Sequence, residues 1–389
     1  MIVFDGLCLV NDKPTVLIPD GESRFALKVL RCLAQVPGLR VSALSREPGA
    51  PIRFSRHLSR FVTHTTDKFD EGRLDATLQA LKKVKADVVL PVDQATSRLV
   101  ATYREEFASV AALPPIAPPH VIDRAGDKWL LTEILRRENI PHPATVLVRP
   151  VQLNPKDYLE RLSYPVLVKP RNSAGGVGIV FFTNQAELEP FLRNQEHSAD
   201  FIIQEFIRGY DLSCSVLCRN GEILAYTIQR GVIPSSTRFY PPAGIEFVYQ
   251  EQVINSIERL MRALNWSGVA NIDLRYDEND KQAKILELNP RYWLSLLGSL
   301  VAGVNFPYLA YLASLGIDFS RPEYRFVPFT YSSRLFGTLL KKYMTANQTV
   351  SGIRNTSLIF TLKDPLPDLY RFSSRIFEKI YHTVAQPLL

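Results

Sequence analysis

Short apolar segments alternate with longer amphipathic ones through the first third of the chain. The short segments have the length and β-rich composition of buried strands, and the longer ones carry apolar residues at helical spacing. We expect strands at 15–19, 40–44 and 87–91, and helices at 21–35 and 75–84. This alternation predicts a parallel sheet covered on both faces, and the proline-rich stretch 113–119 closes the unit. No G-x-G-x-x-G follows the first strand, so the dinucleotide-binding fingerprint is missing.

Strand-like runs follow one another more directly in the next part of the chain. Asn220-Gly221 separates two of them and is a strong signal for a type I′ hairpin turn. We therefore expect an α+β unit with antiparallel hairpins. Its predicted helices are 124–139, one from about 185, and 251–264, and its predicted strands are 164–170, 179–182, 201–206, 212–219, 222–229, 268–276 and 284–289.

The segment 292–317 has no charged residue and is long enough to cross a bilayer. Glycines at 298 and 303, and Asn305 and Pro307, interrupt it. We therefore predict two buried helices that meet at a turn near Asn305–Pro307, rather than a membrane span.

The composition is that of a globular protein, and its positive charge is unevenly distributed. The chain has 389 residues, of which 46% are hydrophobic and 22% charged, which excludes a disordered, collagen-like or coiled-coil chain. The net charge is +7. Residues 321–389 hold ten Lys/Arg and four Asp/Glu, and the first 320 residues hold 36 and 35. A uniformly basic nucleic-acid-binding protein is therefore not expected.

The basic extension 321–389 also has an apolar periodicity. Two groups share this pattern: Leu335, Phe336, Leu339, Leu340 and Tyr343 beside Arg334, Lys341 and Lys342, and Phe372, Ile376 and Ile380 beside Arg371, Arg375 and Lys379. We predict basic amphipathic helices. They either pack on the body of the protein or dock on an anionic membrane surface or an acidic partner.

Four scattered cysteines at 8, 32, 214 and 218 argue against a disulfide scaffold and fit a reducing compartment. Cys214 and Cys218 lie in a predicted strand with no second Cys/His pair nearby, so buried apolar residues are expected rather than a metal pair. The N-terminus lacks a basic region before an apolar run. These features together predict a cytoplasmic protein.

A glycine-rich loop follows Lys169 at the end of a hydrophobic strand. The segment 169–178 has three glycines in its last four residues, which allow close approach of the backbone to a ligand and expose consecutive N–H groups to an anion. Lys169 can point its ammonium at a phosphate, and Lys128 can supply a second cation. The loop does not match a Walker A motif, and the alternative is a flexible hairpin loop.

Two later segments carry further candidate chemistry. The run 201–211 is a strand that leads into a linker, whose backbone can pair with an adenine edge and whose Asp211 can accept from ribose hydroxyls, although an ordinary strand with an exposed turn has the same pattern. Asp273 lies on one predicted strand, and Glu287 and Asn289 share one face of the next. Two carboxylates and an amide oxygen suit Mg²⁺, and Arg291 follows directly, where it can stabilise charge in phosphoryl transfer. The alternative is an exposed Glu–Arg pair.

The order of these motifs resembles the ATP-grasp superfamily over residues 115–318. The matching elements are Lys128, Pro-Val-Leu-Val-Lys-Pro with its glycine loop, Gln-Glu-Phe-Ile-x-Gly-x-Asp, Asp273 and Glu-x-Asn-Pro-Arg. Within the superfamily, the chain is similar to stand-alone carboxylate–amine ligases related to carbamoyl-phosphate synthetase ATP-grasp domains. The resemblance implies a parallel pre-ATP-grasp α/β domain at 1–114 and a two-lobed ATP-grasp domain at 115–320, with a small lobe at about 140–207. The basic helical extension 321–389 would follow.

The resemblance also implies a role for each matching residue. Lys128 and Lys169 would contact nucleotide phosphates beneath a mobile lid that includes Ser173, Gly175, Gly176 and Gly178. Gln204, together with the backbone of Glu205 and Ile207, would meet the adenine, and Asp211 would bind the ribose. Glu287, Asn289 and Asp273 would hold Mg²⁺, with Mn²⁺ as an alternative. Asp211 replaces a commoner Glu, and Asp273 precedes Glu287 by a longer hairpin than usual, which leaves its reach to the metal open.

The implied reaction makes an acyl phosphate from ATP and a small carboxylic acid, plausibly an amino acid, and then joins it to an amine. Arg291, Lys169 and Arg230 are the candidate catalytic residues, and Arg230 and Arg238 are equally consistent with solvated loop charges. Asp93 either binds a ligand or, preferably, caps the following helix, and His142 is expected in a turn. The alternatives are phosphorylation of carbamate or bicarbonate, and a nucleotide-binding regulatory protein without turnover. A homodimer is a further expectation.

Overall fold

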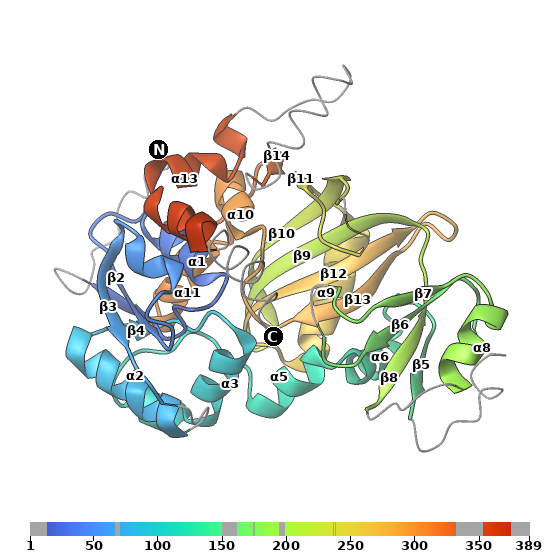
Figure 1. Ribbon diagram of the computed structural model, residues 1–389, viewed down its shortest axis with the longest axis horizontal. Coiled ribbons are helices and arrows are strands. Elements are labelled where there is room, and N and C mark those ends of the chain that lie inside the picture. The colour runs from blue at the N-terminus through green and yellow to red at the C-terminus, as the bar shows by residue number, and fades with distance from the viewer. Residues whose placement is uncertain are drawn as a thin grey trace, which may run out of the picture. The chain divides into compact units, whose positions relative to one another are not determined.

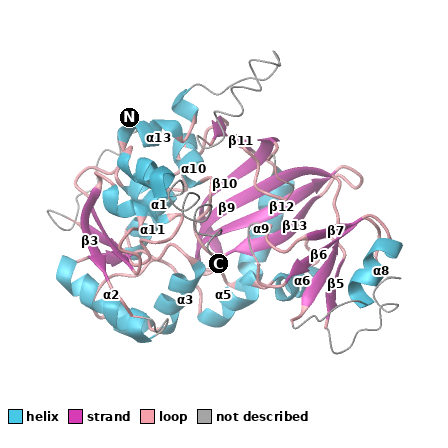
Figure 2. Ribbon diagram, viewed as in Figure 1, coloured by secondary structure: helices cyan, strands magenta, loops and turns pink. Residues whose placement is uncertain are grey.

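The computed structural model describes residues 14–66, 71–149, 162–173, 176–193, 199–235, 237, 239–331 and 353–374. The chain divides into two units, which we describe separately. Unit 1 comprises residues up to Ile116 with 291–324 and the chain from Phe329 onward, and unit 2 comprises Ala117–Pro290 with Arg325–Pro328. Figure 1 shows the course of the chain, and Figure 2 its helices and strands.

Unit 1 contains the expected parallel sheet, with strand order β3-β2-β1-β4. The central strand β1 (Thr15–Ile18) is buried along its length and pairs in parallel with β2 (Arg40–Ser45) and β4 (Val88–Val89). The edge strand β3 (Leu58–Thr63) was not predicted from the sequence, because its polar residues face outward and break the apolar run. The helices of this part are α1 (Ala26–Leu33), η1 (Pro51–Phe54), α2 (Glu71–Val84), α3 (Gln94–Thr102) and α4 (Arg104–Ala108).

The uncharged segment of unit 1 forms two buried helices, as predicted. They are α10 (Leu296–Ala302) and α11 (Phe306–Ser314), and Asn305 caps the second by accepting from the Tyr308 N–H at 3.3 Å. Among the described residues, no single helix is long and apolar enough to cross a membrane. These two helices meet a test of length and hydropathy only when joined, and they bend by 88° at the break.

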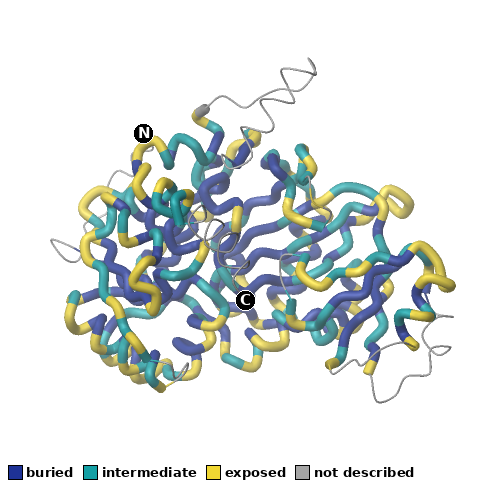
Figure 3. The backbone as a smooth tube through the Cα atoms, viewed as in Figure 1, coloured by how far each residue is buried: buried dark blue, intermediate teal, exposed yellow. Residues whose placement is uncertain are grey.

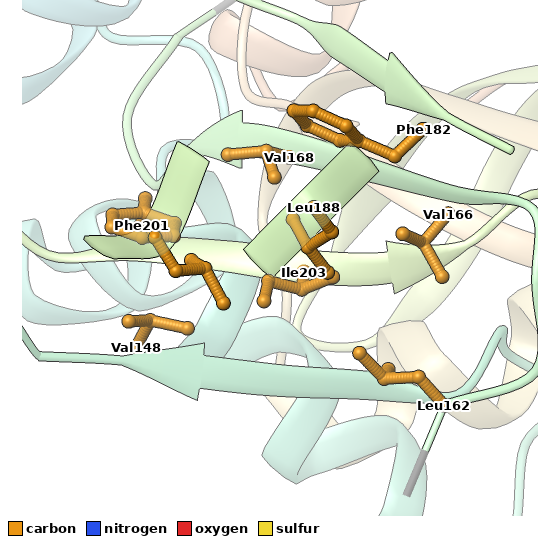
Figure 4. Close-up of a cluster of buried hydrophobic side chains, with 9 residues drawn as sticks. Val148, Leu162, Val166, Val168, Phe182, Leu188, Phe201 and Ile203 are labelled. Carbon is orange, nitrogen blue, oxygen red and sulfur yellow. The ribbon is translucent and has the colours of Figure 1, made fainter. Parts of the chain in front are cut away.

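Unit 2 holds two antiparallel sheets. The smaller has the order β5-β8-β6-β7, formed by β5 (Thr145–Val148), β6 (Val166–Pro170), β7 (Val180–Phe182) and β8 (Phe201–Glu205). Alternate residues of these strands, among them Val166, Val168 and Ile203, form a buried apolar cluster with helix α8 (Gln185–Arg193), as Figure 4 shows. Leu167 and Lys169 therefore point to the opposite face of the sheet.

The larger sheet runs β13-β12-β9-β10-β11. Its strands are β9 (Gly209–Arg219), β10 (Glu222–Ile233), β11 (Gly244–Val248), β12 (Gly268–Asp277) and β13 (Ala283–Asn289), and β14 (Pro328–Thr330) begins at the β11 edge. Asn220 and Gly221 have φ values of 49° and 81°, which confirms the predicted type I′ turn. Helices α5 (Pro119–Gly126), α6 (Lys128–Arg137) and α9 (Glu251–Leu264) pack on this sheet, and many residues of its strands are buried, as the dark blue stretches of the tube in Figure 3 show.

One predicted helix, 124–139, is wrong, because the chain breaks it at Asp127. The Asp127 carboxylate accepts hydrogen bonds from the Trp129 and Leu130 N–H groups at 2.9 and 3.0 Å and so begins a new helix. Lys128 is the first residue of that helix. The remaining elements described are η3 (Ile353–Asn355) and α13 (Leu358–Lys363), with a further helix from 366 that is described to 374. The predicted helix around 335–343 lies outside the described residues.

Candidate functional site

Two acidic side chains lie opposite each other on the larger sheet of unit 2. Asp273 on β12 is the cross-strand partner of Glu287 on β13, and Asn271 is the partner of Asn289. The register therefore places the Asp273 carboxylate beside Glu287, and its reach to a metal stays a prediction. The Asn289 side-chain NH₂ donates to Asp273 Oδ2 and to Glu287 Oε1, both at 3.1 Å.

Three more polar residues continue this row across the sheet toward β9. Ser213 and Ser215 pair with Asp273 and Asn271 in the strand register. The Asn271 NH₂ donates to Asp273 Oδ1 at 2.8 Å, and the Ser215 hydroxyl donates to Asn271 Oδ1 at 2.9 Å. Ser213 Oγ lies 3.0 Å from both acceptors. Because Asp273 Oδ1 is held by Ser213 and Asn271, the orientation of the carboxylate is fixed.

Two buried lysines supply the positive charge. Lys128 Nζ lies 3.2 Å from Glu287 Oε2 and donates to the Ser173 carbonyl of the glycine loop. Lys169 Nζ donates to Gln204 Oε1 at 2.7 Å. Burial lowers the pKa of Lys169 to about 8, and Lys128 adds to this effect while Glu287 opposes it. Burial disfavours the charge on Glu287, but Lys128, the Asn289 amide and Lys169 together keep its pKa below the ordinary value.

Gln204 has both ends of its side-chain amide engaged. Its oxygen accepts from Lys169, and its NH₂ donates to Thr145 Oγ1 at 3.0 Å. Strand alternation places Lys169 and Gln204 on the same face of the smaller sheet, where both are more than nine-tenths buried. The side chain of Gln204 thus positions Lys169, a role that the sequence did not reveal.

The linker between the two sheets is held by Arg275, which the sequence analysis missed. Its Nε donates to the Ile207 carbonyl at 2.6 Å and its Nη2 to the Gly209 carbonyl at 2.8 Å, while its Nη1 binds the Asp211 carboxylate. Its guanidinium also lies 5.3 Å from the centre of the Phe206 ring. The strand register reveals this role, because Arg275 is the cross-strand partner of Asp211.

The glycine loop has the backbone that its composition predicts. Gly176 and Gly178 have φ values of 81° and 76°, and a Cβ at Gly176 would lie 2.6 Å from the Phe239 carbonyl oxygen. Gly175 lies outside the described residues. The base of the loop is fixed by Arg171, which binds the Asp127 and Asp200 carboxylates at 2.7 and 3.0 Å. No role for Arg171 was expected from the sequence.

The described contacts of Arg230 and Arg291 are with other residues. Arg230 donates from Nε to Glu246 Oε1 at 2.6 Å, and its guanidinium lies over the Tyr210 ring. Arg291 belongs to unit 1, where it lies 4.8 Å from the centre of the Phe25 ring and donates to the Tyr292 carbonyl. Their catalytic roles stay predictions, and Arg238 lies outside the described residues.

The acidic and lysine residues lie within a stretch that a known family model matches. The model of the ATP-grasp domain covers residues 125–294. Residues 125–294 are an ATP-grasp domain. The resemblance seen in the sequence is thereby confirmed.

Similarity to curated relatives extends beyond this ATP-grasp domain. The chain is 24% identical to a D-aspartate ligase of Enterococcus faecium over 342 residues, which cover 80% of this chain and 78% of the relative. It is 29% identical to a D-alanine–D-alanine ligase of Acetivibrio thermocellus over 308 residues, covering 74% and 76%. Among solved structures, an ADP complex of N5-carboxyaminoimidazole synthetase from Staphylococcus aureus superposes with a TM-score of 0.64 at 16% identity, covering 88% and 91%. That structural likeness is one of fold.

The structure also bears on the predictions for Asp93, His142, Cys214 and Cys218. Asp93 precedes helix α3, but its side chain makes no capping hydrogen bond, so the expected capping role is wrong. His142 Nδ1 lies 2.7 Å from the Ile140 carbonyl oxygen in an irregular segment before β5, so its place in a turn stays a prediction. Cys214 and Cys218 are fully buried thiols, as expected. Within the described residues, no group of three or more His, Cys, Asp or Glu is arranged to hold a metal.

Proposed function

We propose that this protein is an ATP-dependent ligase that activates a small carboxylic acid as an acyl phosphate and joins it to an amine. One observation carries the proposal. The Lys128 ammonium, which also binds the Ser173 carbonyl of the glycine loop, lies 3.2 Å from Glu287, and the Asn289 NH₂ joins Glu287 to Asp273. A lysine that can bind phosphate and two carboxylates that can bind a metal thus lie next to one another. Both curated relatives described above are named as ligases of amino acids, which supports an amino acid as the acid substrate.

The donor set fits magnesium. Asp273, Glu287 and the side-chain oxygen of Asn289 would hold the ion, which prefers oxygen ligands and keeps positions for water and substrate phosphates. Bound there, Mg²⁺ or Mn²⁺ would supply neutralisation of phosphate charge. The Asn289 NH₂ now faces both carboxylates, and rotation about its terminal torsion exchanges the amide nitrogen and oxygen.

The residues of this chain have distinct tasks in the proposed reaction. The substrate carboxylate oxygen attacks the γ-phosphorus of ATP, the bond to the β-γ bridging oxygen breaks, and ADP leaves. Lys128 and Lys169 would bind the phosphate oxygens, and the loop with Ser173, Gly175, Gly176 and Gly178 would cover them and exclude water. The amine then attacks the acyl carbon, an amide forms and phosphate leaves with the former carboxylate oxygen. Arg291 and Arg230 would stabilise the developing negative charge.

The nucleotide base and ribose are assigned to the linker between the sheets. Backbone atoms of Glu205 and Ile207 would pair with the adenine edge, beside the buried Gln204. Asp211 would accept from the ribose hydroxyls while Arg275 holds its other side. The ion pair between Arg275 and Asp211 orients that carboxylate, which supports the assignment.

The test uses the full chain with Mg-ATP and pools of amino acids and small acids. ADP and phosphate release that depends on an organic acid is expected, and an acid labelled with ¹⁸O in its carboxylate should transfer one labelled oxygen to phosphate. AMP and pyrophosphate as products would contradict the acyl-phosphate route. A requirement for bicarbonate without an organic acid would favour carbamate or bicarbonate phosphorylation, and nucleotide binding without turnover would favour a regulatory protein.

Three organisational features belong to the same proposal. The chain would comprise a pre-ATP-grasp domain at 1–114, a catalytic domain at 115–320 and a basic helical extension at 321–389. It would work in the cytoplasm, and two copies would form a homodimer. Limited proteolysis tests the boundaries, fractionation of cells tests the compartment, and sedimentation equilibrium tests the dimer.

A further inference from the structure

A cluster of large apolar side chains is exposed near the end of the described chain. Leu362, Leu366, Leu369 and Phe372 are 64%, 60%, 59% and 67% exposed. The other exposed large hydrophobic residues of the described chain, such as Val232, Tyr249 and Phe326, are scattered over other elements. Single exposed apolar residues are ordinary, but four within one short segment of a folded surface indicate a site of contact.

Helical geometry places three of these side chains on one surface. Leu366, Leu369 and Phe372 recur every third residue of the helix that runs from 366. Successive members are therefore about 60° apart around the axis and span an arc of about 120°. Leu362 lies on α13, just before the turn that joins the two helices. We call these four residues the 362–372 face.

The other side of this segment is fixed on unit 1, so the 362–372 face cannot turn inward. Asp364 is 1% exposed and accepts hydrogen bonds from Ser55 Oγ at 2.7 Å and from the Arg56 N–H at 3.0 Å. Arg31 Nη2 donates to the Asp364 carbonyl and to Asp368 Oδ2, both at 2.7 Å. Part of the extension thus packs on the body, one of the two alternatives predicted for it.

The same contacts separate the charges of the segment. Asp364 and Asp368 are bound to Arg31 on the inner side. Two bases lie outward near Leu362: Lys363 is exposed, and exposed Arg56 donates to its carbonyl at 3.3 Å. Arg371 lies on the inner side, where it helps burial to lower the pKa of nearby Lys28 to about 8. The 362–372 face is therefore bordered by cations at its Leu362 end.

We propose that the 362–372 face inserts into the headgroup region of an anionic lipid bilayer, with Lys363 and Arg56 bound to lipid phosphates. Apolar side chains bordered by bases, with the acids turned inward, match the two layers of such a surface. A second copy of the chain is a poorer occupant, because a two-fold contact through this face would bring its cations together. The inference stands on these contacts alone and does not depend on ligase activity.

The experiment measures co-sedimentation of the full chain with extruded vesicles. One set contains phosphatidylcholine with 30% phosphatidylserine, and the other phosphatidylcholine alone. We compare the wild-type protein with the triple variant Leu366→Ser, Leu369→Ser, Phe372→Ser. Phe326→Ser is the matched control, because Phe326 is also 67% exposed but lies in another part of the chain. Circular dichroism and thermal unfolding establish that each variant is folded.

The wild-type protein and Phe326→Ser should bind anionic vesicles equally. The triple variant should bind at least roughly tenfold more weakly. Lys363→Glu should weaken binding as well, and added salt should weaken it for every variant. If the triple variant does not fold, the single variants Leu369→Ser and Phe372→Ser are measured, and each should bind roughly threefold more weakly.

Three results would overturn the proposal. One is the absence of binding to anionic vesicles, and another is equal binding to both kinds of vesicle. The third is equal binding of wild-type and triple-variant protein. Sedimentation equilibrium is run on the same samples. If the triple substitution abolishes a dimer and leaves vesicle binding intact, the face joins two copies and the lipid assignment is wrong.

Discussion

Asp273 and Glu287 are direct cross-strand partners, and one side-chain amide, that of Asn289, donates to both carboxylates at 3.1 Å. Two carboxylates held this close repel each other unless a cation or donor lies between them. Lys128 compensates Glu287 from one side. Lys128, the Asn289 amide and Lys169 keep the pKa of Glu287 below its ordinary value, so the pair retains a negative charge, as the proposed Mg²⁺ site requires.

Glu287→Gln should abolish most of the activity while leaving the fold intact. The substitution keeps the shape but removes the charge that binds Mg²⁺, and it leaves buried Lys128 without its anion. We expect substrate-dependent ADP release to fall by at least about a hundredfold. Mn²⁺ binding, followed by electron paramagnetic resonance, should weaken in parallel.

The control for this prediction is Glu278→Gln, because Glu278 is an exposed carboxylate on the same hairpin. It should bind Mn²⁺ and release ADP like the wild-type protein. Full activity of a folded Glu287→Gln variant would remove Glu287 from the metal site.

Gln204→Met should weaken nucleotide binding through Lys169. The substitution removes the oxygen that holds Lys169 Nζ at 2.7 Å and replaces it with an apolar group of similar size. The lysine then has more than one position, and the KM for ATP should rise by roughly tenfold with a smaller change in kcat. Gln252→Met, at an exposed position on α9, is the control. An unchanged KM would mean that Lys169 is held by the surrounding residues without Gln204.

Arg275→Met should loosen the linker that is expected to bind adenine and ribose. It removes hydrogen bonds to the carbonyls of Ile207 and Gly209 and the ion pair with Asp211. We expect the Kd for ADP, measured by calorimetry, to rise by roughly tenfold, because the linker must be ordered on binding. Arg262→Gln, on the exposed side of α9, should leave the Kd unchanged. Equal affinities of the two variants would show that Arg275 does not organise the nucleotide site.

Sequence patterns predicted most strands of both units, because buried strands are apolar and the Asn220-Gly221 turn has a distinctive composition, but they missed β3, β5, β11 and β14. They also identified Lys128, Lys169, Asp273, Glu287 and Asn289 as residues that would act together, and the structure links Lys128, Glu287, Asn289 and Asp273 by direct contacts.

What the sequence missed depends on register and on polar caps. Edge strand β3 has outward polar residues, and the break at Asp127 is created by a single capping carboxylate within a helical pattern. The role of Arg275 follows only from the strand pairing, which places it opposite Asp211. Register follows from contacts between segments distant in sequence, so a local pattern contains little information about it.

Asp364→Ala should release the end of the described chain from unit 1. Asp364 accepts from Ser55 and Arg56 and faces Arg31, whose side chain is only 6% exposed. Arg31 keeps its contact with Asp368, but the Ser55 hydroxyl and the Arg56 N–H lose their acceptor, so the free energy of unfolding should fall by about 2 kcal/mol. Thermal unfolding and the rate of tryptic cleavage near residue 363 measure the effect. Glu105→Gln, an exposed position on α4, is the control, and equal stability of the two would contradict the proposed anchoring.

Asp20 should make the stability of unit 1 depend on pH. Burial, aided by the nearby Asp93 carboxylate, raises its pKa from 3.8 to about 7, against the effects of the Asp93 N–H and Arg73. Between these two values the folded protein holds a proton that the unfolded chain has lost. The free energy of unfolding therefore falls as the pH rises from about 4 to 7. Above about pH 7 Asp20 contributes no further pH dependence.

Asp20→Asn should remove this dependence, because the amide stays uncharged at every pH. The decrease in thermal midpoint between about pH 5 and pH 8 should be smaller in this variant than in the wild-type protein. Asp93→Asn should reduce the decrease as well, since it removes the like charge that helps raise the pKa of Asp20. Glu105→Gln should follow the wild-type curve. If the curves of Asp20→Asn and wild-type protein run parallel, Asp20 is ionised in the folded protein and the buried carboxylate is compensated by Arg73.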